Sequence, residues 1–170
     1  MSVYLIADLH LGHESMAVKR GFKNADEMFE YIKERWNKVV DKRDLVYILG
    51  DVTMEKRRDY PLLDQLQGQK YVVLGNHDLR KDVDEMRKYV DGVAGLVKYK
   101  GVFLSHCPIH PMELDYRVSR CVHGHIHEKS VMKKFMGIPY KKDKRYICVS
   151  CEQVDYTPIE FNKLINRRYD

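Results

Sequence analysis

The sequence predicts an α/β fold in which two sheets pack as a sandwich with helices outside them. Three observations support this prediction. In the first half, apolar strand-like runs alternate with helix-like stretches, which is typical of parallel strands joined by helices. In the second half strand-like runs predominate, which favours a second, mixed sheet. No repeat, low-complexity tract or linker interrupts the 170 residues, so we expect one domain spanning residues 1–170.

The first half contains three runs with the character of buried strands. "VYLIAD", "DLVYILGD" and "KYVVLGNHD" cover residues 3–8, 44–51 and 70–78. Each is a short apolar stretch that ends in glycine or polar residues, as buried strands commonly do. We therefore expect these runs to form neighbouring parallel strands.

Helices are predicted between and after these strands. At 24–40 the apolar residues recur with helical spacing, with Asn24 as N-cap and Glu27 as its capping-box partner. Shorter helices are expected at 60–68 and at 82–92, each closed by its last glycine.

The second half is predicted to be mostly strand. The segment 95–106 contains two strands that turn at Lys100 and Gly101. Further strands are expected at 120–125, 145–150 and 157–165.

Composition favours a soluble globular protein. Hydrophobic residues make up 44% of the chain and charged residues 32%, and no apolar run is long enough for a membrane span. The first residues enter a strand without a basic lead or a small-residue cleavage site, so we expect no signal peptide. A cytoplasmic location is the expectation, with no membrane association.

Charge and cysteines each leave two interpretations open. The formal net charge is +5, and much of the excess lies at 133–146, which would suit an anionic substrate near an active site. We predict a solvated loop there, because we see no interleaved aromatic platform. Cys148 and Cys151 form the one CxxC pair, which is compatible with a redox role but more simply with packing.

Polar residues follow the predicted strands wherever a strand ends. Those that could bear chemistry are Asp8, His10, Asp51, Asn76, His77, Asp78, His106, His125 and His127. Ligand sites of α/β sheets form outside the carboxyl ends of the strands, so we expect these groups to share one rim.

The same segments carry a family resemblance. In order, "DLH", "GD", "GNHD", "SH" and "GHIH" resemble the motif set of the calcineurin-like metallophosphoesterases. The matches run from Asp8 to His127 and no core motif is missing. The resemblance implies a four-layer α/β/β/α sandwich of two mixed sheets with flanking helices.

It also implies two divalent metal ions. One ion would take Asp8, His10, Asp51 and His127, and the other Asp51, Asn76, His106 and His125. Asp51 would bridge them. Oxygen and nitrogen donors favour Mn²⁺, with Fe or Zn²⁺ as alternatives. His123 precedes the last motif and is expected to be structural.

The remaining motif residues imply roles in hydrolysis of a phosphoester by an activated water. His77 would protonate the leaving oxygen and Asp78 would orient its ring. Arg80, Lys81 and His13 are candidate substrate contacts, although Arg80 and Lys81 fit a solvated helical turn equally well.

Departures from the family pattern narrow the range of substrates that we expect. The stretch "GDVTMEK" lacks the arginine that protein phosphatases carry there, and few residues remain after His127 to build a capping domain. We therefore expect a phosphodiesterase acting on small nucleotides or oligonucleotides. The alternatives are a phosphomonoesterase and, because the motif set is complete, less favourably a non-catalytic scaffold. No obligate protein partner is inferred.

Overall fold

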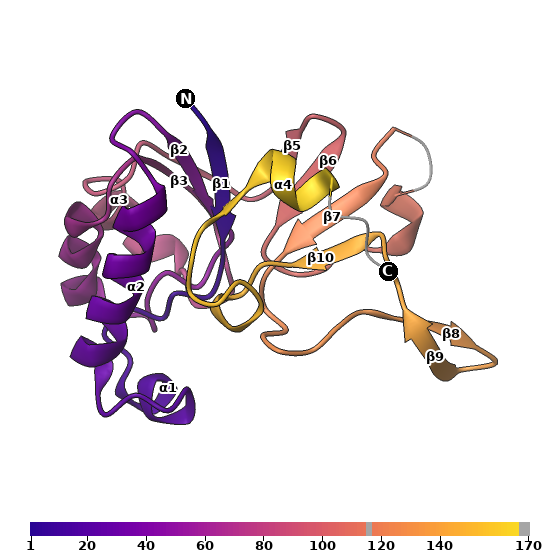
Figure 1. Ribbon diagram of the computed structural model, residues 1–170, viewed down its shortest axis with the longest axis horizontal. Helices are drawn as coiled ribbons and strands as arrows, with labels where there is room; N and C mark the ends of the chain where they lie inside the picture. The colour runs from indigo at the N-terminus through magenta and orange to yellow at the C-terminus, as the bar shows by residue number, and fades with distance from the viewer. Residues whose placement is uncertain (115–116, 167–170) are drawn as a thin grey trace.

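The computed structural model describes residues 1–114 and 117–166, which form two sheets packed face to face (Figure 1). The first sheet has the order β11-β1-β2-β3-β4. Its strands are β1 (Val3–Ile6), β2 (Leu45–Ile48), β3 (Gln69–Val73), β4 (Gly92–Ala94) and β11 (Ile159–Glu160). The first four run parallel and β11 pairs antiparallel with β1. The predicted parallel strands of the first half are confirmed.

The second sheet is mixed, as the sequence predicts. Its order is β10-β7-β6-β5. The strands are β5 (Val97–Tyr99), β6 (Val102–Ser105), β7 (Arg120–His123) and β10 (Tyr146–Cys148). β5 and β6 turn at Lys100 and Gly101, whose φ values of 46° and 76° are the left-handed pair that a tight hairpin turn requires.

Helices cover the outer face of the first sheet (Figure 1). The longest is α2 (Ala25–Val39), accompanied by α1 (Glu14–Lys19) and α3 (Val83–Met86). The Asn24 side chain accepts a hydrogen bond of 2.8 Å from the Glu27 N–H, which confirms the N-cap. The Glu27 carboxylate accepts from the N–H of Lys23 instead of Asn24, so the reciprocal half of the capping box is shifted by one residue.

Two of the shorter helical predictions need correction. The segment predicted as a helix at 60–68 is the 3-10 helix η1 (Arg57–Gln65), which starts earlier and contains Pro61. The helix expected at 82–92 is only α3, preceded by η2 (Arg80–Asp82), and Gly92 opens β4 instead of closing a helix. A Cβ on Gly92 would lie 2.7 Å from ring carbons of Tyr71, so close strand packing explains this glycine.

The C-terminal part of the chain differs from its predictions at two places. At 157–165 the predicted strand is only β11, and the chain continues as α4 (Phe161–Asn166). At 133–146 the predicted loop is a hairpin of β8 (Met132–Phe135) and β9 (Ile138–Lys142), which projects from the body (Figure 1). Met136 and Gly137 make its turn with φ values of 49° and 82°. Because nearly all of its residues are exposed, the hairpin has no alternation of buried and exposed positions that would predict strands.

Three apolar clusters separate the layers. Between the sheets lie Leu5, Leu49, Val73, Leu104, Val122, Ile147, Phe161 and Leu164. A second cluster, which includes Met28, Ile32 and Trp36, joins the helices to the first sheet. A third, around Leu114 and Tyr146, covers the outer face of the second sheet next to η3 (Pro111–Leu114). The four-layer sandwich is thereby confirmed. Among the described residues, the short helix η3 contributes Leu114 to the layer outside the second sheet.

The two sheets are joined by backbone hydrogen bonds at the end of β1. The N–H of Ala7 donates to the carbonyl of Val149 at 2.9 Å, and the N–H of Cys151 donates to the carbonyl of Ala7 at 3.0 Å. This junction fixes the carboxyl ends of both sheets against each other. None of the helices in the described ranges is long and apolar enough to cross a bilayer.

Candidate metal centre

Seven polar side chains meet at the rim where strands of both sheets end. Asp8 and His10 follow β1, Asp51 follows β2, Asn76 follows β3, His106 follows β6, and His125 and His127 follow β7. The Asn76 Oδ1 lies 2.8 Å from His106 Nε2 and 2.9 Å from His125 Nδ1. Segments far apart in sequence thus bring nitrogen and oxygen donors to one place, as predicted.

The donor atoms form groups compact enough to hold a metal ion. Within 4.8 Å of one another lie the groups Asp8–His10–His127, Asp8–Asp51–His106 and His106–Cys107–His125. The first group holds three of the four residues expected for one ion. Cys107 is a residue that sequence reasoning left out, since a single cysteine after a histidine carries no signal of its own.

Asp51 stands between the two halves of the cluster. Its Oδ2 lies 3.9 Å from His10 Nε2, and its Oδ1 lies 3.5 Å from His106 Nε2. The two oxygens of one carboxylate therefore face different imidazoles, which is the arrangement that a bridging ligand requires.

His10 carries the clearest sign that a cation fits here. Its ring is 2% exposed, and neither ring nitrogen has a hydrogen-bond partner among the described residues. Burial, helped by the positive charge of Arg20, lowers the pKa of His10 to about 2, so the ring is neutral. A buried ring nitrogen without a hydrogen-bond partner costs free energy. A neutral imidazole can coordinate a metal ion through such a nitrogen.

Two other imidazoles are held with a defined ring nitrogen toward the cluster. The Nδ1 of His106 lies 2.9 Å from the carbonyl oxygen of Leu49, and the Nδ1 of His127 lies 2.9 Å from Glu152 Oε1. Each Nδ1 carries the proton, because both partners are acceptors. The Nε2 of His106 then faces other candidate ligands, 2.8 Å from Asn76 Oδ1 and 3.2 Å from His125 Nδ1. Metal-binding histidines are usually oriented in this way by a hydrogen bond at the other ring nitrogen.

A buried ion pair without any local sequence signal supports His127. Arg20 Nε donates to Glu152 Oε1 at 2.8 Å, and a second guanidinium nitrogen donates to the Asp8 carbonyl at 2.8 Å. Burial raises the pKa of Glu152, but the hydrogen bond from His127 and the charge of Arg20 outweigh it and bring that pKa down to about 2. Glu152 is thus a fixed negative charge behind the rim. Its partners lie far away in sequence, so spacing alone could not reveal it.

The backbone of the rim is strained where it delivers side chains. Asp8, His10, Asp51, His125 and His127 all have left-handed φ values, between 49° and 70°. For residues other than glycine this conformation costs about 1–3 kcal/mol each, and it is found preferentially at functional sites. Backbone hydrogen bonds hold two of these turns, from Asp8 N–H to the Gly50 carbonyl and from His10 N–H to the Asp51 carbonyl, both 3.0 Å.

Sequence comparison assigns the chain to a family. The family model of the calcineurin-like phosphoesterases matches residues 1–110. The chain belongs to the calcineurin-like phosphoesterase family. Membership places it among phosphoester hydrolases and leaves the choice between diesters and monoesters open.

One curated relative and one solved structure match nearly the whole chain, and a phage protein matches about half of it. The uncharacterized protein MJ1445 of Methanocaldococcus jannaschii is 30% identical over 170 residues, covering 96% of this chain and 89% of its own. The Gene 66 protein of Mycobacterium phage D29 is 36% identical over 83 residues, covering 45% of this chain and 40% of its own. The crystal structure of AQ665, a protein of unknown function from Aquifex aeolicus, has a TM-score of 0.69 and 25% identity, covering 96% of this chain and 97% of its own.

The expected partnership of His77 with Asp78 needs correction. The Asp78 carboxylate is buried and accepts three backbone N–H groups, from Asp51 and Gly75 at 2.8 Å and from Val52 at 3.1 Å. The side chain beside the His77 ring is Glu55, whose Oε1 lies 3.2 Å from Nδ1. Burial of the Asp78 carboxylate between two loops is the reason that it cannot orient the imidazole.

The candidate substrate contacts divide into two kinds. The His13 ring lies at the rim, with its centroid 6.0 Å from that of His10, and burial lowers its pKa. Arg80 and Lys81 are exposed, and within the described residues neither side chain forms a hydrogen bond or ion pair with a candidate ligand. His13 therefore lies beside the cluster of candidate ligands, whereas Arg80 and Lys81 make no bonded contact with it.

Cys148, Cys151 and His123 lie behind the rim. Cys148 Sγ lies 3.4 Å from the His127 carbonyl oxygen, and Cys151 is fully buried, which raises its pKa to about 12. His123 is 1% exposed with Nδ1 2.8 Å from the Gly124 carbonyl oxygen. None of the three belongs to a possible metal-binding group among the described residues.

Replacing Glu152 with Gln is expected to weaken metal binding roughly 10- to 100-fold, because His127 loses the charged acceptor that fixes its ring. Metal titration of the purified protein measures this. Glu160→Gln, which changes a carboxylate paired with Lys163 away from the rim, is the matched control. Unchanged affinity in Glu152→Gln would contradict the orienting role.

Proposed function

We propose that this chain hydrolyses phosphodiester bonds of small nucleotides or oligonucleotides with two divalent metal ions, of which Mn²⁺ is favoured. The observation that carries the proposal is the position of Asp51, with one carboxylate oxygen toward His10 and the other toward His106. A carboxylate between two sets of candidate ligands can bridge two ions, as the two-metal sites of phosphatases and nucleases would need for ions held close together.

The ligand sets proposed for the two ions are those that the family resemblance implies. One ion would be held by Asp8, His10, Asp51 and His127, and the other by Asp51, Asn76, His106 and His125. These side chains offer nitrogen and oxygen, which suit Mn²⁺, Fe or Zn²⁺. The Cys107 thiol beside His106 and His125 adds a sulfur donor, which would shift the preference of the second site toward Zn²⁺ or Fe.

When bound, two divalent ions activate a water and neutralise charge on the phosphoryl group. His77 is the side chain that would protonate the leaving oxygen. Glu55 Oε1 lies 3.2 Å from Nδ1, so it can orient the ring while Nε2 gives a proton to the leaving oxygen. Asp78 acts on the site through the backbone, because it fixes the loops that carry Asp51 and His77.

Two features favour a diester over a monoester. Asn76 and His125 are exposed, so the outer side of the cluster is open to a substrate with groups on both sides of phosphorus. Arg20, the arginine that the structure brings next to Asp8, already donates to Glu152 and to backbone carbonyls, so it cannot clamp a dianion. A phosphomonoesterase is the second candidate.

We propose a single domain in a reducing, cytoplasmic compartment. The core between the sheets contains Leu5 and Leu164 together, so both ends of the chain contribute to it. All four cysteines are free thiols, which fits a compartment where disulfides do not form.

Bis-p-nitrophenyl phosphate and p-nitrophenyl phosphate, compared with added Mn²⁺, test the function directly. We expect a higher kcat/KM for the diester, by a modest margin, because metal charge also assists a monoester. The shared leaving group removes its pKa as a variable. A clear monoester preference would establish the phosphatase, and no turnover with any divalent metal would favour the scaffold.

Asp51→Asn is expected to weaken both metal sites, because it removes the one shared charge. His10→Ala should weaken mainly the site that contains Asp8 and His127. Metal analysis of the purified proteins, together with their melting temperatures, separates ligand loss from unfolding. Retention of two full equivalents in Asp51→Asn would refute the bridging role.

His77→Ala is expected to lower turnover about 10²–10⁴-fold for a diester with an alkoxide leaving group, with metal content intact. The loss should be much smaller for bis-p-nitrophenyl phosphate, since nitrophenolate leaves without a proton. Glu55→Gln should lower turnover of the same alkoxide diester by a smaller factor, because it changes the group beside Nδ1 and leaves the ring in place. Equal losses for both leaving groups would show that His77 is not the acid.

A further inference from the structure

The hairpin β8–β9 and the residues that follow it carry an excess of positive charge. The segment from Met132 to Arg145 contains six basic side chains and one acidic one, a net charge equal to the +5 of the whole chain. Lys133, Lys134, Lys141 and Lys142 form no ion pair with any described residue. The one acid, Asp143, is bonded to Arg145 at 2.9 Å.

One pair of these lysines lies in a position that destabilises the hairpin. Lys133 and Lys141 are directly opposite each other in the register of the two strands. Like charges in that position destabilise a strand pair, so the hairpin's folding does not explain them. A polyanion bound between them would turn this repulsion into attraction.

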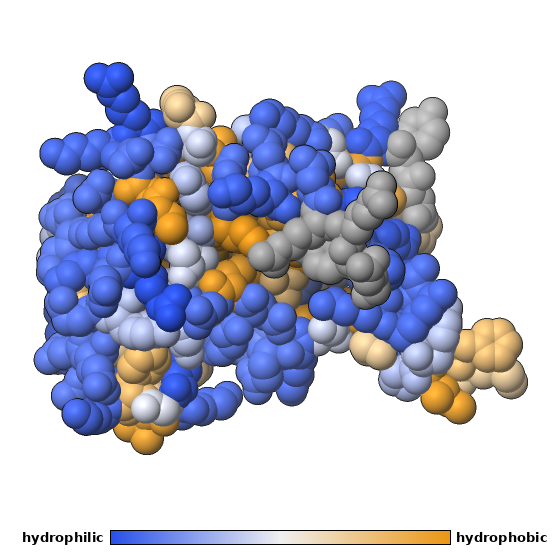
Figure 2. Space-filling view, in the orientation of Figure 1, coloured by the Kyte–Doolittle hydropathy of each residue, from blue (hydrophilic) through white to orange (hydrophobic). Residues whose placement is uncertain are grey.

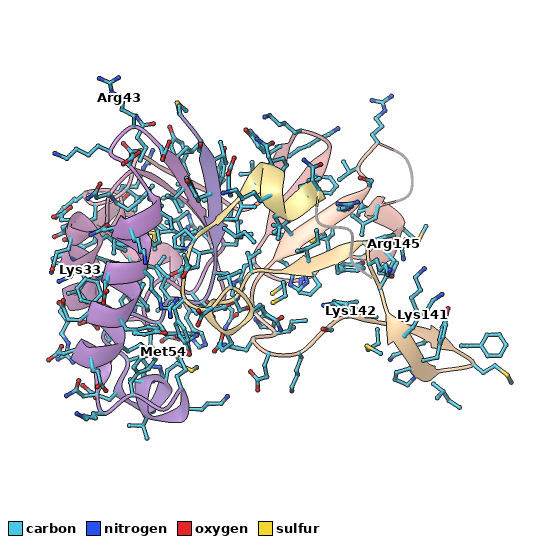
Figure 3. All side chains as sticks on the ribbon, viewed as in Figure 1. Lys33, Arg43, Met54, Lys141, Lys142 and Arg145 are labelled. Carbon is cyan, nitrogen blue, oxygen red and sulfur yellow. The ribbon has the colours of Figure 1, made fainter. Side chains whose placement is uncertain are left out.

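The basic side chains also surround a hollow at the base of the hairpin. It has a volume of about 320 Å³. Its lining consists of Ser119, Arg120, Lys133, Lys141, Lys142, Asp143, Lys144 and Arg145. Figure 3 shows Lys141, Lys142 and Arg145 near one another where the hairpin joins the second sheet. A hollow lined by cations on several sides suits a chain of phosphates better than a flat charged surface.

Apolar side chains project beyond these lysines. Phe135 is 71% exposed, Ile138 69% and Tyr140 56%. In Figure 2 the tip of the hairpin stands out as an apolar end beside blue, hydrophilic side chains. Aromatic rings next to lysines are the combination that binds single-stranded nucleic acid, with bases stacked on rings and phosphates held by cations. Two exposed rings, Phe135 and Tyr140, thus lie in the basic segment, and Lys141 Nζ is 5.4 Å from the centroid of the Tyr140 ring.

We propose that the hairpin β8–β9 binds the single-stranded part of an oligonucleotide substrate, with the lysines on its phosphates and Phe135 and Tyr140 on its bases. The inference rests on the proposed phosphodiesterase function and names its substrate class. The chain leads directly from the rim to the hairpin, since β8 begins five residues after His127. The hollow lies at the amino ends of β7 and β10 and the rim at their carboxyl ends, so an oligonucleotide that contacts both would run along the second sheet.

Binding of a fluorescein-labelled 12-nucleotide single strand, in EDTA so that nothing is cleaved, tests this. In a variant with Lys133, Lys134, Lys141 and Lys142 changed to Gln, we expect affinity to fall at least ten-fold at low salt. The slope of log K against log salt should become shallower by roughly 0.7 for each phosphate that a lysine no longer neutralises. The matched control changes four other exposed lysines, Lys19, Lys38, Lys42 and Lys98, to Gln and should keep both affinity and slope close to the unchanged protein.

Phe135→Ala with Tyr140→Ala separates stacking from charge. Affinity should fall at least about five-fold while the salt slope stays the same. Hydrolysis of bis-p-nitrophenyl phosphate should be unchanged in both hairpin variants, because that substrate has no strand to bind.

Three results would overturn the inference. They are unchanged oligonucleotide binding in the four-lysine hairpin variant, an equal loss in the control variant, and binding to phosphatidylserine vesicles with none to the oligonucleotide. Because binding is measured without turnover, this outcome is independent of the proposed chemistry. Oligonucleotide binding without hydrolysis of any ester would refute the phosphodiesterase alone.

Discussion

The carboxylate of Asp78 holds together the loops on which the candidate centre depends. It accepts backbone N–H groups from Asp51, Val52 and Gly75, so the ends of β2 and β3 are bound to one buried side chain. Burial raises the pKa of this carboxyl, and the three hydrogen bonds oppose that rise. Gly75 must lack a side chain there, because a Cβ would lie 2.3 Å from Asp51 Oδ1. The position of Asp51, with its two carboxylate oxygens toward His10 and His106, follows from this contact.

The rim concentrates strain that the rest of the sandwich can sustain. Five of its donor residues have left-handed backbones, and His10 keeps its ring nitrogens buried without partners among the described residues. The apolar layers on both sides of the first sheet, and the junction of Ala7 with Val149 and Cys151, hold these turns in place. Cation binding would relieve the buried imidazole and the crowded carboxylates together, so the rim stores free energy that favours the ion.

The sequence predicted those parts of the fold and of the rim that depend on local residue patterns. The apolar runs predicted β1, β2 and β3, and their polar ends predicted which residues would meet at the rim. It failed where the partner of a residue is set by distant contacts. Asp78 follows His77 in sequence but turns into the protein, and Glu55 reaches the ring because the loop after β2 folds back over it. The pair of Arg20 and Glu152 joins residues from opposite ends of the chain. The hairpin was missed because its exposed strands bury no face and therefore leave no period to detect.

The candidate metal-binding residues and the proposed binding hairpin lie on elements that differ in how tightly packing constrains them. The donor residues extend from buried strands, where a change of backbone would disturb the core and the junction between the sheets. The hairpin buries almost nothing and makes its main contacts within itself. Its side chains can therefore change with little effect on the free energy of unfolding. In a chain of this size, selectivity for a substrate is more easily altered on such an arm than at the rim, where each donor also shapes a strained turn. With the hairpin as the proposed substrate-binding element, a rim of fixed donors could serve different phosphoesters, because the element that selects the ester would lie outside the core that holds the donors.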